Sequence, residues 1–259
     1  MNACSWGSEV PPSFPRTACI LAALVLAWPV PAFAQLNDTG QTQCYTTDNV
    51  ATACNDASTG DTSALPGQDG RYGRDAAQAA GAMPPKSGGG VAGFDFTRIC
   101  WNGAAEGSAD CTGPLVANTT GAASATPSTD WACTRDNVTG LVWSLRTLLP
   151  PQETVTWDKA MVSTFPDVGH NGVKRCGYDT GWRLPTRREL LSIVLYSTSP
   201  AVPAIDPTFF PSTPLMYFWS SDPSASSSLA AWYVDFNIGA SNTGAKGTPY
   251  SVRLVRNGQ

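Results

Sequence analysis

The chain has 259 residues, a formal net charge of −4, and charged side chains at only 14% of its positions. About 25% is usual, so the charge content is low for a cytosolic protein. There is no surplus of Lys and Arg to neutralise phosphates, which argues against a nucleic-acid-binding protein. Glycine, proline and small polar residues are abundant, and this composition predicts long loops held together by disulfides.

Residues 1–34 have the features of a secretory signal peptide. The basic residue Arg16 precedes the apolar run 20–30, and the small residues Ala32 and Ala34 stand just before the predicted cleavage point. The run is short for a membrane span, so an uncleaved anchor is the less favoured alternative. We therefore predict export to the periplasm, the cell surface or the extracellular space, with no membrane span after cleavage.

Six cysteines follow the predicted cleavage point, and an even number in an exported chain predicts disulfides. We expect cysteines that are neighbours in the sequence to pair, which gives Cys44–Cys54, Cys100–Cys111 and Cys133–Cys176. A zinc site is the competing interpretation. Because the chain has no Cys-x-x-Cys motif and a single histidine, His170, we predict no metal site.

Residues 35–128 show almost no apolar periodicity and are predicted to form a loop-rich N-terminal region stapled by disulfides. Segment 66–75 is rich in turn-forming residues. Segment 93–100 places Phe94, Phe96 and Arg98 on one face, which predicts a strand.

The composition changes near residue 129, where a second region, 129–259, becomes rich in tryptophan. Segment 141–145 is predicted as a strand, and Thr156 is predicted to cap a short helix. The clearest local signal is a capping box formed by Thr186 and Glu189, in which each residue satisfies a free backbone amide of the other. It predicts a helix from position 187 to about position 196.

Three strands are predicted after this helix, at 217–220, 232–236 and 252–255, with the segment 237–249 as a loop between the last two. In such an antiparallel meander, Arg253 would face Asp235 across the sheet. The predicted class is therefore α+β, with two short helices and a small antiparallel sheet.

Several motifs of the C-terminal half occur together in one known family. They include Asp-Asn-Val-Thr-Gly-Leu-Val-Trp at 136–143, Gly-Trp-Arg-Leu-Pro-Thr at 181–186, and further pieces at 156–160, 218–221, 231–236 and 252–256. On these motifs, residues 130–256 resemble the Lcl C-terminal domain family, named for a bacterial collagen-like adhesin. The resemblance implies a C-type-lectin-like fold in surface or secreted proteins, some of which bind sulfated glycans as trimers. The chain lacks the adhesin's Gly-X-Y repeat, so the adhesin role and a trimer are open alternatives that rest on the resemblance alone.

A basic cluster is the first candidate ligand site. Arg187 and Arg188 occupy the first two positions of the predicted helix, where positive charges oppose the helix dipole by roughly 0.3–1 kcal/mol each. An acidic glycan would offset this cost. The candidate residues are Lys174, Arg175, Arg183, Arg187 and Arg188. The alternative is that the arginines pair with Asp179 or Asp206, or are simply solvated.

Aromatic side chains give the second candidate. Four tryptophans fall on regular elements, where a core role is favoured: Trp143, Trp182, Trp219 and Trp232. Trp101 and Tyr233 are freer to stack on a sugar ring.

Two other chemistries have weak signals. Calcium is a lectin-like possibility, but its donors lack compact spacing: Asp222, Asp235, Asn237 and Asn242. Segment 220–222 with His170 suggests a hydrolase, but no Gly-x-Ser-x-Gly elbow accompanies it. We expect no cofactor and no enzyme activity.

The sequence leaves three functional hypotheses. The first is an exported binding module for carbohydrate, including sulfated or acidic glycans, with a role in adhesion. The second is a structural subunit of a surface assembly, whose partner is another envelope protein. The third is an enzyme related to the formylglycine-generating fold, which would need Cys133 and Cys176 as a reactive pair.

Overall fold

The structure, a computed structural model, describes residues 38–46, 48, 50–52, 54, 68–147, 155–162, 174–196 and 203–258. The predicted signal peptide and His170 lie outside these residues. Residues 34–259 form one unit. Within the described ranges, every helix is too short or too polar to span a bilayer.

The N-terminal part of this unit is a small hairpin followed by two short helices. Its elements are β1 (Cys44–Tyr45), β2 (Ala51–Thr52), α1 (Asp69–Tyr72) and α2 (Arg74–Ala79). The Cys44–Cys54 disulfide closes the hairpin. The buried carboxylate of Asp38 accepts hydrogen bonds from the backbone N–H groups of Gly40 and Arg74, at 2.8 and 2.9 Å. Neither α1 nor α2 contributes a buried residue, so polar contacts and the disulfide organise this part.

A five-stranded sheet forms one half of the remaining structure. Its strands are β3 (Phe96–Cys100), β4 (Val116–Ala117), β5 (Asp130–Asp136), β6 (Leu141–Thr147) and β10 (Arg253–Asn257). The order is β10-β6-β5-β3, all antiparallel, and β4 pairs in parallel with β5. The strands predicted at 93–100 and 141–145 are therefore present. Because β3 and β4 come from the region 35–128, the two predicted regions share one sheet.

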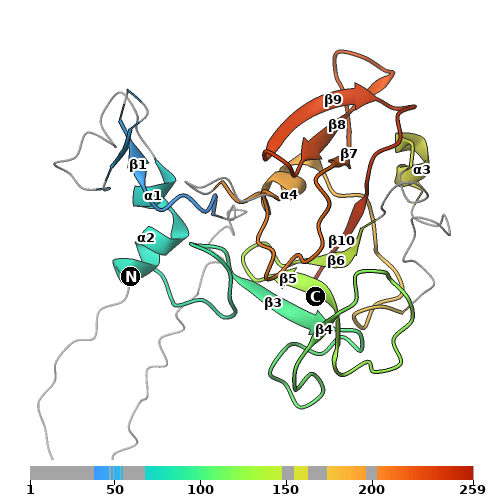
Figure 1. The fold of residues 1–259 in the computed structure, drawn as a ribbon, viewed down its shortest axis with the longest axis horizontal. Coiled ribbons are helices and arrows are strands. Elements are labelled where there is room, and N and C mark those ends of the chain that lie inside the picture. The colour runs from blue at the N-terminus through green and yellow to red at the C-terminus, as the bar shows by residue number, and fades with distance from the viewer. Residues whose placement is uncertain are drawn as a thin grey trace, which may run out of the picture. The chain divides into compact units, whose positions relative to one another are not determined.

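A three-stranded antiparallel sheet forms the other half. It consists of β7 (Tyr217–Pro223), β8 (Ala230–Asp235) and β9 (Ala240–Ala245), in that order. Figure 1 shows these three strands side by side, with α4 (Arg187–Leu191) close to them. One face of this sheet packs on the core through Phe218 and Val234, which lie opposite each other in the register.

The predicted meander is wrong in its third strand. Segment 240–245, predicted as loop, is the edge strand β9, whereas β10 pairs with β6 in the other sheet. β9 reads Ala-Ser-Asn-Thr-Gly-Ala, without a large apolar residue, because it buries little at the edge of its sheet. Apolar periodicity therefore gave no signal for it. The tight turn before β9 uses Gly239, whose φ is +73°.

Arg253 consequently does not pair with Asp235. Its side chain is fully buried, and its Nη1 and Nη2 atoms donate hydrogen bonds to the Ser144 carbonyl and the Thr213 hydroxyl, at 2.9 and 2.7 Å. Asp235 instead accepts a hydrogen bond from the Asn237 backbone N–H, at 2.8 Å. The predicted cross-strand ion pair is wrong because the two residues lie in different sheets.

The two helices predicted in the C-terminal half are α3 (Trp157–Met161) and α4. Thr156 stands at the N-cap of α3, but its side chain makes no capping hydrogen bond. The capping box of α4 is confirmed. The helix ends at Leu191 and does not reach Tyr196. The chain turns into tertiary contacts there, where the Tyr196 N–H donates to the Thr39 carbonyl at 2.7 Å.

Two apolar clusters fill the interior, one rich in phenylalanine and one around the Cys133–Cys176 disulfide. Trp143 lies in the first, and Trp182 and Trp219 lie in the second, each buried as predicted. Trp232 is only half-buried, so its predicted core role is wrong. The fold is mixed α+β, mainly antiparallel, with a few short helices.

All three predicted disulfides are confirmed: Cys44–Cys54, Cys100–Cys111 and Cys133–Cys176. The third spans 43 residues of sequence, against 10 and 11 for the others. It ties β5 to the turn at 175–178, a turn that belongs to no helix or strand.

The loop length of each disulfide predicts its contribution to stability. Replacing Cys133 and Cys176 by Ala should lower the free energy of unfolding by about 4 kcal/mol, against about 3 kcal/mol for Cys44 and Cys54, because a longer closed loop restricts the unfolded chain more. Denaturant unfolding of the two double variants measures the difference. Equal losses, or a larger loss for the short loop, would contradict this account.

Candidate ligand-binding site

Three tyrosines meet on the face of the β7–β8–β9 sheet that is opposite to Phe218 and Val234. They are Tyr217 on β7, Tyr233 on β8, and Tyr250, which precedes β10. The ring centroids of Tyr217 and Tyr233 are 4.6 Å apart, and each lies 5.2 Å from that of Tyr250. We call this group the tyrosine shelf.

Strand register and one buried tryptophan position the tyrosine shelf. Trp219 lies opposite Tyr233 in the β7–β8 pair, and side chains two residues apart on a strand share a face, so Tyr217 joins them. Trp219 is fully buried, and its ring centroid lies 4.3 Å from that of Tyr250. Its indole N–H donates to the Val155 carbonyl at 3.0 Å. The shelf therefore stands on a fixed, buried base.

The tyrosine shelf presents both ring surface and hydroxyl groups. The Tyr217 side chain is 42% exposed, and those of Tyr233 and Tyr250 are half-buried. Among the described residues, none of the three hydroxyls is hydrogen-bonded, so they are available to a ligand. Asn242 on β9 lies opposite Tyr233 and adds an amide beside the rings.

The environment of the shelf favours the protonated hydroxyls of Tyr233 and Tyr250. Burial raises the pKa of Tyr233, and Tyr217 and Asp235 raise it further. Burial, then Tyr233 and Tyr217, raise the pKa of Tyr250 in the same direction. Neutral hydroxyls can both donate and accept hydrogen bonds, as sugar hydroxyls require.

The structure does not bring the predicted basic cluster together. Arg183 is committed to Glu189, whose carboxylate it holds with two hydrogen bonds of 2.8 and 2.6 Å. Arg175 is buried against Trp101. Lys174 and Arg188 are exposed.

Arg187 has a different partner from those expected. Its guanidinium lies 4.0 Å from the ring centroid of the half-buried Trp232, and its backbone N–H donates to the Asp222 carboxylate at 2.7 Å. Within the described part of the chain, neither Arg187 nor Arg188 forms an ion pair with Asp179 or Asp206. A cation–π contact and solvation therefore offset the helix-dipole cost, and the predicted pairing is wrong.

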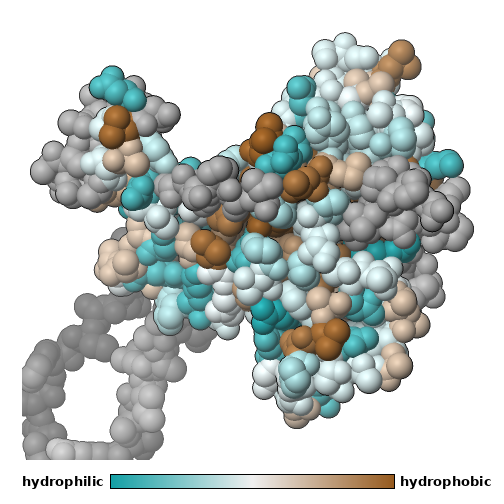
Figure 2. Space-filling view, viewed as in Figure 1, coloured by the Kyte–Doolittle hydropathy of each residue, from teal (hydrophilic) through white to brown (hydrophobic). Residues whose placement is uncertain are grey.

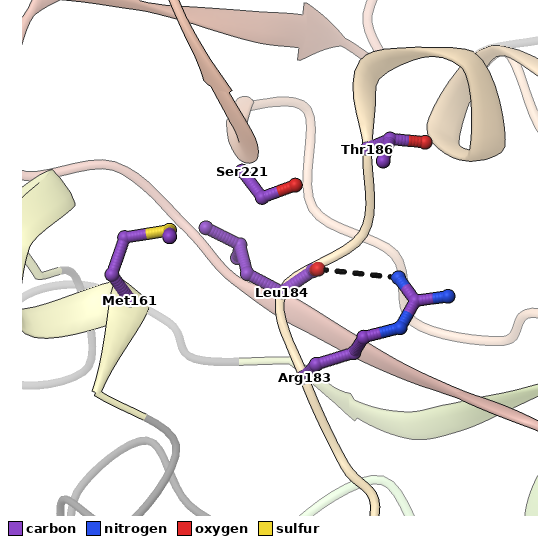
Figure 3. Close-up of a pocket in the computed structure, with 5 residues that line it drawn as sticks. All are labelled: Met161, Arg183, Leu184, Thr186 and Ser221. Atoms are coloured by element: carbon purple, nitrogen blue, oxygen red, sulfur yellow. Dashed lines mark hydrogen bonds between the residues drawn. The ribbon is translucent and has the colours of Figure 1, made fainter.

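A pocket of about 380 Å³ lies between α3 and the segment that leads into α4. Figure 3 shows Met161 and Leu184 lining it, with Arg183, Thr186 and Ser221 around them. The Arg183 guanidinium and the Thr186 hydroxyl are already bound to Glu189. The pocket therefore offers few free polar groups to orient a ligand.

The residues considered for a calcium site and for a hydrolase site are not brought together either. Asp222 and Asp235 accept backbone hydrogen bonds from separate segments, and Asn242 accepts one from the Thr243 N–H. Ser220 is buried, and its hydroxyl donates to the Trp232 carbonyl at 2.9 Å. In the described ranges, no three His, Cys, Asp or Glu side chains come together as a metal site.

Sequence reasoning found Tyr233 but missed its two companions. Tyr217 had a usable signal, because it lies two residues before Trp219 on the same strand face. Tyr250 had none, since it reaches the shelf from outside any regular strand and contacts Gly244. An added Cβ at Gly244 would lie 2.7 Å from the Tyr250 hydroxyl oxygen, so the glycine makes room for the ring.

Comparison with known families agrees with the motifs. The match covers residues 132–256, from β5 to β10. This segment is an Lcl C-terminal domain. The Lcl C-terminal domain is a domain of bacterial surface proteins. It contains the entire tyrosine shelf, whereas β3 and β4 precede it. No curated protein sequence matches the chain.

The Arg183–Glu189 pair of the Lcl C-terminal domain gives a test of α4. Burial alone would raise the pKa of Glu189, but hydrogen bonds from Arg183 and the Thr186 backbone outweigh it and lower the pKa. Glu189→Gln should reduce the free energy of unfolding by about 1 kcal/mol at pH 7, because a charge-assisted pair is lost.

The pH dependence of this difference has a defined sign. A lowered carboxyl pKa stabilises the fold above the usual Glu range, and this contribution is lost as the pH falls below about 4. Glu106→Gln is the matched control, since its single contact with Arg98 is more exposed and caps no helix. If the two variants lose equal stability, or if the loss persists in acid, the account is wrong.

Two tyrosines of the Lcl C-terminal domain, Tyr233 and Tyr250, should titrate above the pH of free tyrosine. The raised pKa of Tyr233 and Tyr250 stabilises the folded state up to the usual tyrosine range, and this stabilisation is lost as the pH rises through the folded values. Ultraviolet absorbance of tyrosinate in wild type, Tyr233→Phe and Tyr250→Phe assigns each step. A Tyr233 or Tyr250 step at or below the pH of free tyrosine, about 10, would contradict the geometry.

Proposed function

We propose that this protein is an exported carbohydrate-binding module of a bacterial surface protein, and that the tyrosine shelf is its binding face. The observation that carries the proposal is the set of three contacting tyrosine rings over a buried tryptophan, with hydroxyls that no described residue binds. Ring faces pack against the C–H face of a sugar, while hydroxyl tips bond its polar groups. A C-type-lectin-like fold, as the resemblance implies, would suit this role.

Export is supported by two features. The first is the signal-peptide pattern of residues 1–34, and the second is the set of three disulfides, which persist in oxidising compartments. A sheet face also suits binding, because its rings are held in place before the ligand arrives and little ordering entropy is lost.

Binding is favoured over catalysis by the state of the cysteines. An enzyme of the formylglycine-generating class would need Cys133 and Cys176 as reactive thiols. They are bonded to each other, and both are fully buried. Ser220 and Asp222, the remaining hydrolase candidates, are occupied by structural hydrogen bonds.

The proposed binding site is the tyrosine shelf and not the arginines predicted from the sequence. Arg183 and Arg187 are engaged by Glu189 and Trp232, so they do not form a convergent anion site. Figure 2 shows apolar residues on the visible face as separate patches between polar ones. On the coloured part of that face, no continuous apolar surface of the kind that favours an assembly subunit is visible.

A glycan array that includes neutral, uronic and sulfated glycans tests the proposal. Tyr233→Ala should weaken binding of the best glycan by about tenfold or more, because a central stacking ring is removed. Tyr72→Ala, which removes an exposed tyrosine of α1 outside the shelf, is the matched control and should bind like wild type.

The array also separates the competing sites. A double variant of Arg187→Ala and Arg188→Ala should keep its binding, and moderate salt should change it little, if the rings carry the affinity. Salt-sensitive binding that the double variant loses would transfer the site to the arginines. Binding to no glycan by a folded protein would reject the sugar-binding proposal and favour the assembly subunit.

A further inference from the structure

A second polar site lies at Arg175, apart from the residues of the tyrosine shelf. The Arg175 side chain is 1% exposed, and its guanidinium carbon lies 4.7 Å from the ring centroid of Trp101. Its Nη2 atom donates a hydrogen bond to the Gly121 carbonyl. Its Nε and Nη1 atoms are buried and have no acceptor among the described residues. A cation at the protein interior is thus held by one neutral oxygen and one aromatic face.

A second arginine lies beside it. Gly121 has a φ of +79°, and a Cβ added there would lie 2.4 Å from Arg146 Cδ and 2.9 and 3.0 Å from the two terminal nitrogens of Arg175. Both arginines therefore press against the same glycine. Burial, and after it the charge of Arg146, lowers the pKa of Arg175 to about 10. The surroundings disfavour the cation, yet the fold places it there.

The donor geometry of Arg175 indicates which kind of acceptor would bind its free nitrogens. A guanidinium carries five N–H donors in one plane, and stacking on an aromatic ring leaves all five available. Buried donors almost always have acceptors. In the described part of the chain, no carboxylate accepts a hydrogen bond from Arg175, so an acceptor with negative charge would satisfy both the free nitrogens and the local charge.

The loop over Arg175, residues 118–122, is held together by a side chain of its own. The Asn118 side chain staples it internally, accepting from the Gly121 N–H at 3.1 Å and donating to the Ala122 carbonyl at 2.9 Å. Thr120 and Ala122, on either side of Gly121, are exposed. Removing Gly121 from Arg175 gives up one hydrogen bond to a neutral carbonyl, which an anionic acceptor would replace with a stronger one.

We propose that Arg175, with Arg146 beside it, binds an oxyanion group of a ligand when the loop 118–122 moves away. The shared chemistry is a sulfate, phosphate or carboxylate group with oxygens that accept from the guanidinium plane. Arg183, Arg187 and Arg188 take no part. The site is independent of the tyrosine shelf, so the failure of either proposal leaves the other standing.

Side-chain NMR of the full mature protein, with nitrogen-15 in its arginines, tests the proposal. The probes are inorganic sulfate, inorganic phosphate and acetate, each titrated against chloride at constant ionic strength. We expect the Arg175 Nε–H resonance to shift saturably with at least one anion. Comparison of the three anions then distinguishes a tetrahedral group from a carboxylate. Arg175→Lys should weaken binding about tenfold or more, because a planar fork is replaced by a point charge.

Arg135→Lys is the matched control. It changes a half-buried arginine of β5, whose Nε donates to Asn137 at 3.1 Å, and should leave the response to anions unchanged. Absence of a saturable Arg175 shift with all three anions overturns the proposal, and so does an unchanged affinity in Arg175→Lys. If that variant does not fold, the wild-type resonance still decides, since it reports on Arg175 directly.

Discussion

Trp219 fastens the three-stranded sheet to the segments around α3 and before β10. Its ring N–H donates to the Val155 carbonyl before α3, and its backbone N–H donates to the Ser251 carbonyl before β10, both at 3.0 Å. The residue is fully buried. The β7–β8–β9 sheet is thereby fixed to the segments that enter the larger sheet. The tyrosine shelf is held in a fixed position, because its rings pack on Trp219 and not on a loop.

The second constraint is covalent. Much of the described chain lies outside helices and strands, and the Cys133–Cys176 disulfide fastens the turn at 175–178 to β5. Cys176 adopts a φ of +51°, a conformation that a side-chain-bearing residue rarely takes. The turn is closed further by hydrogen bonds between the backbones of Arg175 and Tyr178, at 2.7 and 2.9 Å. The disulfide of the neighbouring Cys176 therefore helps to hold the buried Arg175 in place.

The sequence predicted features that depend on local chemistry. The capping box at Thr186 and Glu189, the three disulfides and the strand at β6 follow from short-range patterns, and all are present. The edge strand β9 did not follow, because it buries no large apolar side chain. The positions of Tyr250 and Arg253 could not be predicted either. The order of strands along the chain does not show that β10 pairs with β6 and not with the preceding strands β8 and β9.

The candidate site was predictable only in part for the same reason. Tyr233 lies on an alternating strand, so its outward direction could be read from the sequence. The proximity of Tyr217 and Tyr250 is a tertiary fact, set by strand register in one case and by Gly244 in the other. The basic residues predicted to converge around α4 do not do so, because Arg183 is bound by Glu189 and Arg187 lies over the ring of Trp232.

A buried arginine does not by itself indicate a ligand, and Arg253 shows why. Burial lowers its pKa to about 9, and no carboxylate in the described chain accepts its hydrogen bonds. Yet both of its terminal nitrogens have acceptors, Ser144 and Thr213, and it lies among phenylalanine rings deep in the fold. Arg253 has a structural role, because it links Ser144 and Thr213 inside the core. Arg253 and Arg175 each have a buried Nε without an acceptor among the described residues, but Arg175 lacks one at Nη1 as well, and its cover is an exposed loop of small residues. The distinction between a structural cation and a binding cation therefore rests on the unfilled terminal nitrogen and the loop that covers it, and not on charge or burial.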